Sequence, residues 1–125
     1  MQLTFDNAIK AKIAPYLQKG AKILLDFDDG IGPFVDHAIA CSIGISYRII
    51  IIDENDDSKD YQEIIKSNLG VIYSKKYANY TLADDLKLSI KPPFNTWQLS
   101  GDGMLIDDGV QLITKFFKEV DNVKR

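Results

Sequence analysis

Residues 38–52 read AIACSIGISYRIIII and carry the clearest structural signal in the chain. In the first part of this stretch, up to Tyr47, apolar residues recur at every second position, which is the period of a strand with one face against a core. Four consecutive isoleucines, Ile49 to Ile52, then follow. An unbroken apolar run of this kind is typical of a strand that is buried on both faces. The stretch therefore predicts a long strand whose second half is enclosed on both sides.

Further strand signals flank this stretch. Residues 22–27 form an apolar run that ends at the breaker Asp28-Asp29-Gly30, and Leu86, Leu88 and Ile90 alternate with lysine and serine before Pro92-Pro93. We expect this alternating face, together with Trp97, to lie in the core. Asp-Gly pairs are hairpin signals. Shorter strands are predicted at residues 3–5, 62–66, 71–73, 97–99, 104–106 and 110–113, with turns at 68–70, 101–103 and 107–109.

Helical spacing is found near each end of the chain. Asp6 is a predicted N-cap, because its carboxylate can accept the free amide hydrogens of a first helical turn. The helix it begins is expected over residues 7–18, with Pro15 as a point of kinking. Apolar residues between 113 and 124 predict a second, amphipathic helix. With helices at the ends rather than between strands, we expect an α+β fold, strand-rich, with a mainly antiparallel sheet.

Composition limits the classes of function. The 125 residues suit a single domain, 1–125, with its core at about 1–112 and the C-terminal helix at about 113–124. A net charge of −3 argues against a nucleic-acid partner. No export signal and no run long enough to cross a membrane is visible, so we expect a cytoplasmic protein. One cysteine and one histidine exclude an internal disulfide and a His-rich metal site.

The acidic loop from Asp53 to Asp60 invites comparison with a calcium-binding loop. Asp53, Asn55 and Asp57 stand at ligand positions, but Ser58 replaces the turn glycine and Ile64 replaces the closing glutamate. We therefore expect a solvated loop that binds calcium weakly or not at all. No pair of carboxylates and no serine elbow stands out either, so the sequence favours a protein that is not an enzyme.

His37 and Cys41 are the best metal-ligating side chains in the chain, and they are four residues apart. On a helix this spacing would place them on one face. On a strand it would separate them by about 13 Å, too far for one ion to bridge. A loop around His37 could shorten that distance. The alternative interpretation makes Cys41 a small core residue and His37 a polar residue at the strand entry.

The order of elements also resembles a known family. Leu3-Thr4-Phe5-Asp6 precedes an alanine-containing helix, residues 22–27 form a strand, and Cys41-Ser42 with Gly44 is similar to the first cysteine segment of the HesB/IscA-like iron–sulfur biogenesis domain, the A-type carriers. Residues 86–90 are similar to one of that family's later strands. The likeness spans about residues 1–112 and is closest to short HesB-like proteins of low-GC Gram-positive bacteria such as lactobacilli.

The resemblance implies a role in iron–sulfur cluster biosynthesis, with assembly proteins as partners, a homodimer and an iron–sulfur cluster as cofactor. The family's carriers have two further cysteines in a C-terminal Cys-Gly-Cys segment, which this chain lacks. A [2Fe–2S] cluster is held by four thiolates, whereas two chains would supply only two. Cys41 is therefore the candidate metal ligand, with His37 after it, on a carrier-like protein without the usual ligand set. The alternative is a small-molecule or protein-binding module on the same scaffold with no metal role.

Overall fold

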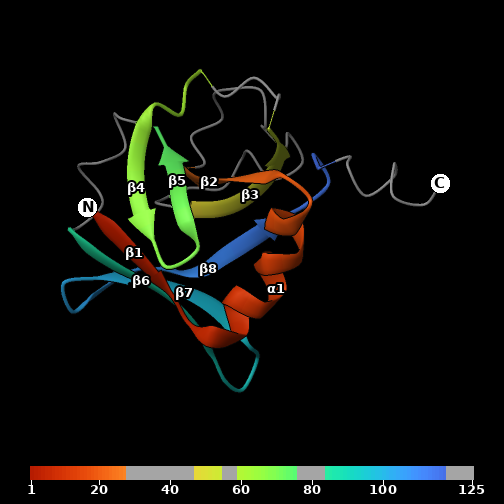
Figure 1. Cartoon of the computed structure of the whole chain (residues 1–125). Coiled ribbons are helices and arrows are strands. Elements are labelled where there is room, and N and C mark those ends of the chain that lie inside the picture. The colour runs from red at the N-terminus through yellow and green to blue at the C-terminus, as the bar shows by residue number, and fades with distance from the viewer. Residues whose placement is uncertain (28–46, 55–58, 76–83, 118–125) are drawn as a thin grey trace, which may run out of the picture.

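The structure is a computed structural model that describes residues 1–27, 47–54, 59–75 and 84–117. Within these residues, the strands form one closed barrel in the order β1-β4-β5-β2-β3-β8-β7-β6, with the helix α1 packed against it (Figure 1). The elements are β1 (Gln2–Phe5), α1 (Asn7–Gln18), β2 (Ala21–Phe27), β3 (Tyr47–Asp53), β4 (Glu63–Ser67), β5 (Gly70–Ser74), β6 (Asp85–Lys91), β7 (Thr96–Gly101) and β8 (Met104–Ile113).

The barrel mixes two kinds of strand pairing. Neighbours in sequence pair antiparallel, as in β2–β3, β4–β5, β6–β7 and β7–β8. The pairs β1–β4, β1–β6, β2–β5 and β3–β8 are parallel. The expected α+β fold with a mainly antiparallel sheet is therefore wrong. Hairpin signals in the sequence report only the sequential pairs, whereas the parallel pairs join strands that are far apart in the chain.

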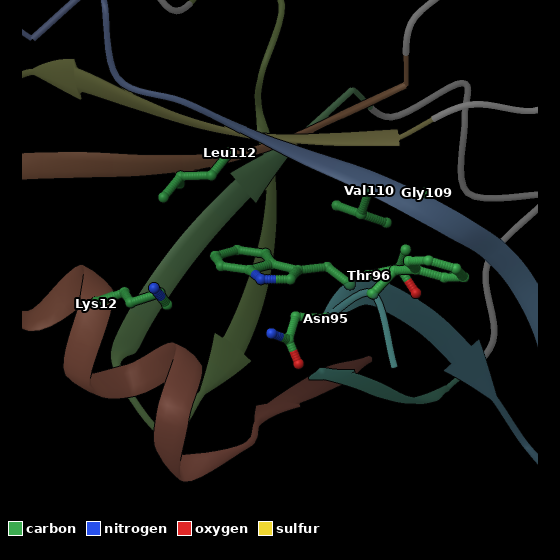
Figure 2. Close-up of a pocket in the computed structure, with 8 residues that line it drawn as sticks. Lys12, Asn95, Thr96, Gly109, Val110 and Leu112 are labelled. Carbon is green, nitrogen blue, oxygen red and sulfur yellow. The ribbon is translucent and has the colours of Figure 1, made fainter. Parts of the chain in front are cut away.

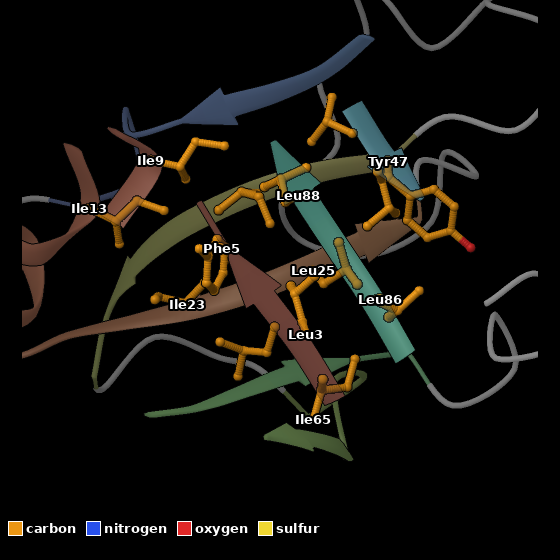
Figure 3. Close-up of a cluster of buried hydrophobic side chains, with 14 of the residues drawn as sticks. Leu3, Phe5, Ile9, Ile13, Ile23, Leu25, Tyr47, Ile65, Leu86 and Leu88 are labelled. Atoms are coloured by element: carbon orange, nitrogen blue, oxygen red, sulfur yellow. The ribbon is translucent and has the colours of Figure 1, made fainter. Parts of the chain in front are cut away.

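The isoleucine run occupies β3 as predicted and serves two clusters of buried side chains. Ile49 and Ile51 point to the main core, and Ile50 and Ile52 point to a second cluster with Leu24 and Tyr61. All four isoleucines are fully buried. The main core also takes residues from the barrel strands and from one face of α1 (Figure 3); these include Leu3, Phe5, Ile9, Ile13, Ile23, Leu25, Ile65, Leu86 and Leu88. Of the face predicted from residues 86–90, Leu86 and Leu88 are buried, whereas Ile90 and Trp97 are only partly buried.

The helix α1 spans the predicted residues and begins as predicted. The Asp6 carboxylate accepts hydrogen bonds from the backbone N–H groups of Ala8, at 2.9 Å, and Ile9, at 3.2 Å. Pro15 lies inside the helix. No helix among the described residues is long and apolar enough to cross a membrane.

The C-terminal helix expected from about residue 113 is the second correction. Strand β8 continues through Ile113, and residues 114–117 form a turn in which the Phe117 N–H donates to the Thr114 carbonyl. Phe116 packs on the second cluster, while Phe117 enters the main core. The apolar spacing therefore serves two different clusters across a turn instead of one face of a helix. The rest of the expected helix, 118–124, lies outside the described residues.

The third correction concerns residues 104–113, which form one strand instead of two short strands around a turn. Asp107 lies within β8, and the β7–β8 register shifts on either side of Leu99. The Asp107 carboxylate accepts from the N–H of Gly109 at 2.9 Å and from the N–H of Tyr47 at 2.8 Å. The Asp-Gly sequence thus marks an irregularity in the ladder, and its carboxylate ties β8 to β3.

Candidate functional site

The two residues predicted as metal ligands, His37 and Cys41, lie outside the described residues, and the metal prediction stays a prediction. Their segment, 28–46, connects β2 to β3 in the sequence. It leaves β2 after Phe27 and returns at Tyr47, and these two residues are register partners in the β2–β3 ladder. Both ends of the cysteine-bearing connection are therefore attached to the same place on the barrel.

This attachment point is held firmly on the main-core face. The rings of Phe27 and Tyr47 pack with their centroids 5.4 Å apart. Tyr47 is buried, and its backbone N–H donates to the Asp107 carboxylate on the neighbouring strand. A buried backbone donor with a partner costs little, whereas an orphaned one costs about 1–3 kcal/mol. These contacts fix the ends of the connection relative to the barrel.

On the opposite face, directly next to this point, lies a buried polar network centred on Asp26. Asp26 and Arg48 are register partners on β2 and β3, and Arg48 donates from Nε at 3.0 Å and from Nη2 to the Asp26 Oδ2. The Tyr61 hydroxyl donates to Oδ1 at 2.6 Å, and the Lys75 Nζ lies 3.3 Å from the same oxygen. Lys75 also donates to the Phe27 carbonyl at 3.3 Å. Two cations and a phenol therefore converge on one carboxylate.

Burial makes this network energetically important. Asp26 is 0% exposed, and Arg48, Lys75 and Tyr61 are at most 3% exposed. Charges removed from water are tolerated only when they are paired and hydrogen-bonded. The Nη1 of Arg48 is buried and has no hydrogen-bond partner among the described residues. An ordered water molecule is the ordinary partner of such a group.

The geometry limits what Asp26 can do chemically. Each of its oxygens already accepts two hydrogen bonds or ion-pair contacts, so the carboxylate has no lone pair available to bind a metal or to accept a substrate proton. The network is therefore structural in chemistry. It joins β2 and β3 to Tyr61, two residues before β4, and to Lys75, the residue after β5, at the point where the connection 28–46 attaches.

The acidic loop is described only in part. Asp53 ends β3, Glu54 follows it in a turn, and residues 55–58 lie outside the described residues. No group of three or more histidine, cysteine, aspartate or glutamate residues converges within the described residues. The weak calcium binding predicted for this loop stays a prediction.

A second feature is an open cleft of about 400 Å³ between α1, the β6–β7 turn and β8. Its lining residues are Lys12, Phe94, Asn95, Thr96, Trp97, Gly109, Val110 and Leu112. Figure 2 shows Lys12 reaching from α1 along one side of the cleft, with Val110 and Leu112 on β8 opposite. Phe94 is 85% exposed, which leaves its ring available for contact.

Neither the Asp26 network nor the cleft was predicted from the sequence. A signal for the network was present, because Asp26 and Arg48 each interrupt an otherwise apolar strand. A charged residue inside a doubly buried strand needs a partner, and a pair of opposite sign is the simplest one. The cleft had no such signal, because its residues come together only when β8 pairs with β7 and α1 packs beside them.

The described residues thus define a small closed barrel of parallel and antiparallel strands, and the one cysteine of the sequence is found in the connection between β2 and β3. The chain belongs to the iron–sulphur cluster biosynthesis family, whose family model matches residues 1–114. The resemblance drawn from the sequence is therefore confirmed. No curated protein matches the chain significantly.

Two of the solved structures that are similar to this chain come from lactobacilli. The first is a "putative Fe-S biosynthesis protein" from Lactobacillus salivarius, whose structure was described as a novel fold. It is 29% identical, with a TM-score of 0.79 over 94% of this chain and 99% of that one. The second, a "putative Fe-S biosynthesis protein" from Lactobacillus acidophilus, is 21% identical, with a TM-score of 0.68 over 98% of this chain and 99% of that one. The second likeness shows the fold alone.

Proposed function

We propose that this chain is a non-enzymatic accessory of iron–sulfur cluster assembly that does not hold a stable cluster by itself. The observation that carries the proposal is the family match over residues 1–114 in a chain that has a single cysteine. The family match supports a role in iron–sulfur cluster biosynthesis. The single cysteine argues against a stable cluster, because a [2Fe–2S] cluster needs about four thiolate ligands or their substitutes.

The Asp26 network supports a role for the scaffold in presenting Cys41. It fixes both ends of the connection 28–46, in which Cys41 and His37 are found. Asp26 itself is fully engaged and does not add a ligand. Any metal bound at Cys41 would therefore need ligands from other residues, from a second chain or from a partner protein.

Anaerobic purification followed by iron, sulfide and zinc analysis tests the proposal. We expect far less than one iron per chain after desalting, in the native chain and in Cys41→Ala alike. A brown protein that keeps about one iron per chain and loses it in Cys41→Ala would overturn the proposal. A control with the exposed residue Met104→Ala, which should behave as the native chain, guards against nonspecific iron loss.

The assembly role needs a second experiment. We expect the tagged full-length chain to enrich iron–sulfur assembly proteins from an anaerobic lysate, relative to an unrelated tagged barrel protein of the same size. Absence of such enrichment would count against the accessory role. Labelling of the native chain with a thiol reagent then tests Cys41: rapid labelling favours a presented thiol, and labelling only after unfolding favours a core residue.

The second candidate function is a protein-binding module with no metal role. The cleft beside Trp97 favours it, because the cleft is open to solvent and its lining combines the aromatic rings of Phe94 and Trp97 with aliphatic side chains and the cation of Lys12. The metal analysis does not bear on this candidate, so the two functions are tested separately.

A further inference from the structure

We propose that the cleft beside Trp97 binds an acidic peptide segment of a partner protein, with an aromatic or aliphatic side chain against Trp97 and a carboxylate beside Lys12. The inference does not depend on whether the chain binds iron. It rests on the exposure, the chemistry and the charge of the residues that line the cleft.

Apolar side chains line one part of the cleft. Trp97 is only partly buried although it packs against the main core, so part of the indole remains accessible from the cleft. Phe94 stands at its rim and is 85% exposed. Val110 and Leu112 line it from β8. Exposed aromatic rings are enriched at protein interfaces, where they bury a large area at a small cost in conformational entropy.

The charge of the cleft has one sign. Lys12 is the ionisable residue among those that line it, and it forms no ion pair among the described residues. Helix α1 carries Lys10 and Lys12 and no acidic residue. A carboxylate on the ligand would therefore meet an ammonium group that has no ion-pair partner among the described residues, whereas a basic ligand would be repelled by it.

Asn95 adds a hydrogen-bonding side chain to the lining of the cleft. Asn95 adopts a positive φ of 56°, a conformation that asparagine tolerates better than most residues. Its side chain lines the cleft next to Phe94, where an amide can both donate to and accept from a peptide backbone. Figure 2 shows Asn95 and Lys12 on the same side of the cleft.

The shape favours a peptide over an enclosed small molecule. The cleft is wide open to solvent along its length, and small-molecule sites bury about 70–90% of their ligand. An open cleft can take one side chain and a short stretch of backbone without enclosing them. The occupant is therefore the acidic, apolar segment of a partner protein.

The experiment uses the full chain and the fluorescence of Trp97, the chain's one tryptophan. The probe is acetyl-Ser-Asp-Phe-Asp-Ser-amide, and the matched neutral probe is acetyl-Ser-Asn-Phe-Asn-Ser-amide. We expect the acidic probe to give a saturable change with a Kd of about 0.1–1 mM. The neutral probe should bind at least about twofold more weakly, because it lacks the ion pair with Lys12.

Variants at the surface locate the binding without threatening the fold. Phe94→Ala should weaken the acidic probe about 2- to 10-fold, and Lys12→Ala should weaken it about 2- to 5-fold. Their controls are Met104→Ala, which removes another exposed apolar side chain, and Lys10→Ala, which removes a lysine two residues away on the same helix. Both controls should bind as the native chain does.

Several results would overturn the proposal. No saturable change with the acidic probe would do so, as would equal binding of the neutral probe or equal affinity in Phe94→Ala and Met104→Ala. Binding of free naphthylacetate with the same variant pattern, and no binding of the peptide, would show that the occupant is a small aromatic acid. That result would also count against the peptide assignment.

Discussion

The side chain of Asn68 hydrogen-bonds both backbone groups of Phe5. Its Nδ2 donates to the Phe5 carbonyl oxygen at 2.9 Å, and its Oδ1 accepts from the Phe5 N–H at 3.0 Å. The β1–β4 register has the pairs Gln2–Lys66 and Leu3–Ser67, so the amide of Asn68 extends this short parallel ladder past its last pair. The Asn68 side chain thus makes the hydrogen bonds to Phe5 that a backbone residue of a neighbouring strand would otherwise make.

Replacement of Asn68 by alanine should therefore destabilise the barrel. The substitution leaves the N–H and the carbonyl of Phe5 without these partners, and Phe5 is fully buried. We expect a loss of about 1–3 kcal/mol in the free energy of unfolding, measured by urea denaturation. Asn7→Ala, on the exposed first turn of α1, is the control and should cost less than about 0.5 kcal/mol. Equal losses in the two variants would contradict this assignment.

Asp6 joins the helix to the sheet and gives stability a dependence on pH. Its Oδ2 accepts from the Ile90 N–H at 3.1 Å, while its Oδ1 caps α1. The hydrogen bond from Ile90 is the main cause that lowers the pKa of Asp6, with help from the N–H groups of Ile9 and Ala8 and the charge of Lys87, against a smaller opposing effect of burial. Because the folded pKa lies below the unfolded value, this stabilisation is present above about pH 4 and is lost as the pH falls through the folded pKa.

Asp6→Asn tests this dependence. Asparagine can still cap the helix, but its amide nitrogen cannot accept from the Ile90 N–H, so we expect a loss of about 1 kcal/mol at neutral pH. Urea denaturation of both chains over about pH 7 to pH 2 should show the difference between them shrink below about pH 4. A difference that stays constant over the whole range would show that the charge of Asp6 does not matter.

The sequence predicted individual elements better than their assembly. The isoleucine run predicted the position of β3, and the alternation at residues 86–90 predicted that of β6. The N-cap Asp6 predicted the first residue of α1. These signals are local, because they depend on which face of one strand or helix meets apolar surroundings. The parallel pairing of β1 with β4 and β6 depends on which distant strands meet, and no local pattern carries that information.

The same distinction explains the errors at the C-terminal end. Asp107-Asp108-Gly109 has turn chemistry, but the Asp107 carboxylate takes up the Tyr47 N–H of another strand, so the chain continues as β8. Phe116 and Phe117 have helical spacing relative to Ile113, yet they pack into separate clusters. For the candidate site, the family could be predicted from the sequence, while the role of Cys41 stays a prediction. The charged residues Asp26 and Arg48 in apolar strands indicated buried partners, but that they pair with each other follows only from the β2–β3 register.

Leu88→Ala should show how much the main core contributes. Leu88 is 0% exposed at the centre of β6, so its truncation removes buried area and leaves a cavity. We expect a loss of about 2–5 kcal/mol in the free energy of unfolding. Leu105→Ala makes the same chemical change at a position that is 58% exposed and should cost less than about 1 kcal/mol. Similar losses at the two positions would show that the barrel interior is not packed around Leu88.

Loss of Asp26 and loss of Arg48 should lower the free energy of unfolding by unequal amounts. Asp26→Asn removes the carboxylate that Arg48 and Lys75 both contact, so two buried cations lose a shared counter-charge. We expect a loss of about 3–5 kcal/mol in the free energy of unfolding. Arg48→Met should cost less, because Asp26 keeps its bonds with Tyr61 and Lys75 while methionine fills much of the arginine's volume. It also removes the buried Nη1 that has no partner among the described residues.

A double-mutant cycle measures this inequality directly. In Asp26→Asn combined with Arg48→Met, one of the two cations is gone, so the loss should be smaller than the sum of the single losses by about 0.5–3 kcal/mol. Urea denaturation of the four chains at neutral pH gives all the required free energies. If the losses add, or if Arg48→Met costs as much as Asp26→Asn, the carboxylate is not the centre of the network, and the attachment point of the cysteine-bearing connection must be stabilised chiefly by the Phe27–Tyr47 packing on the other face.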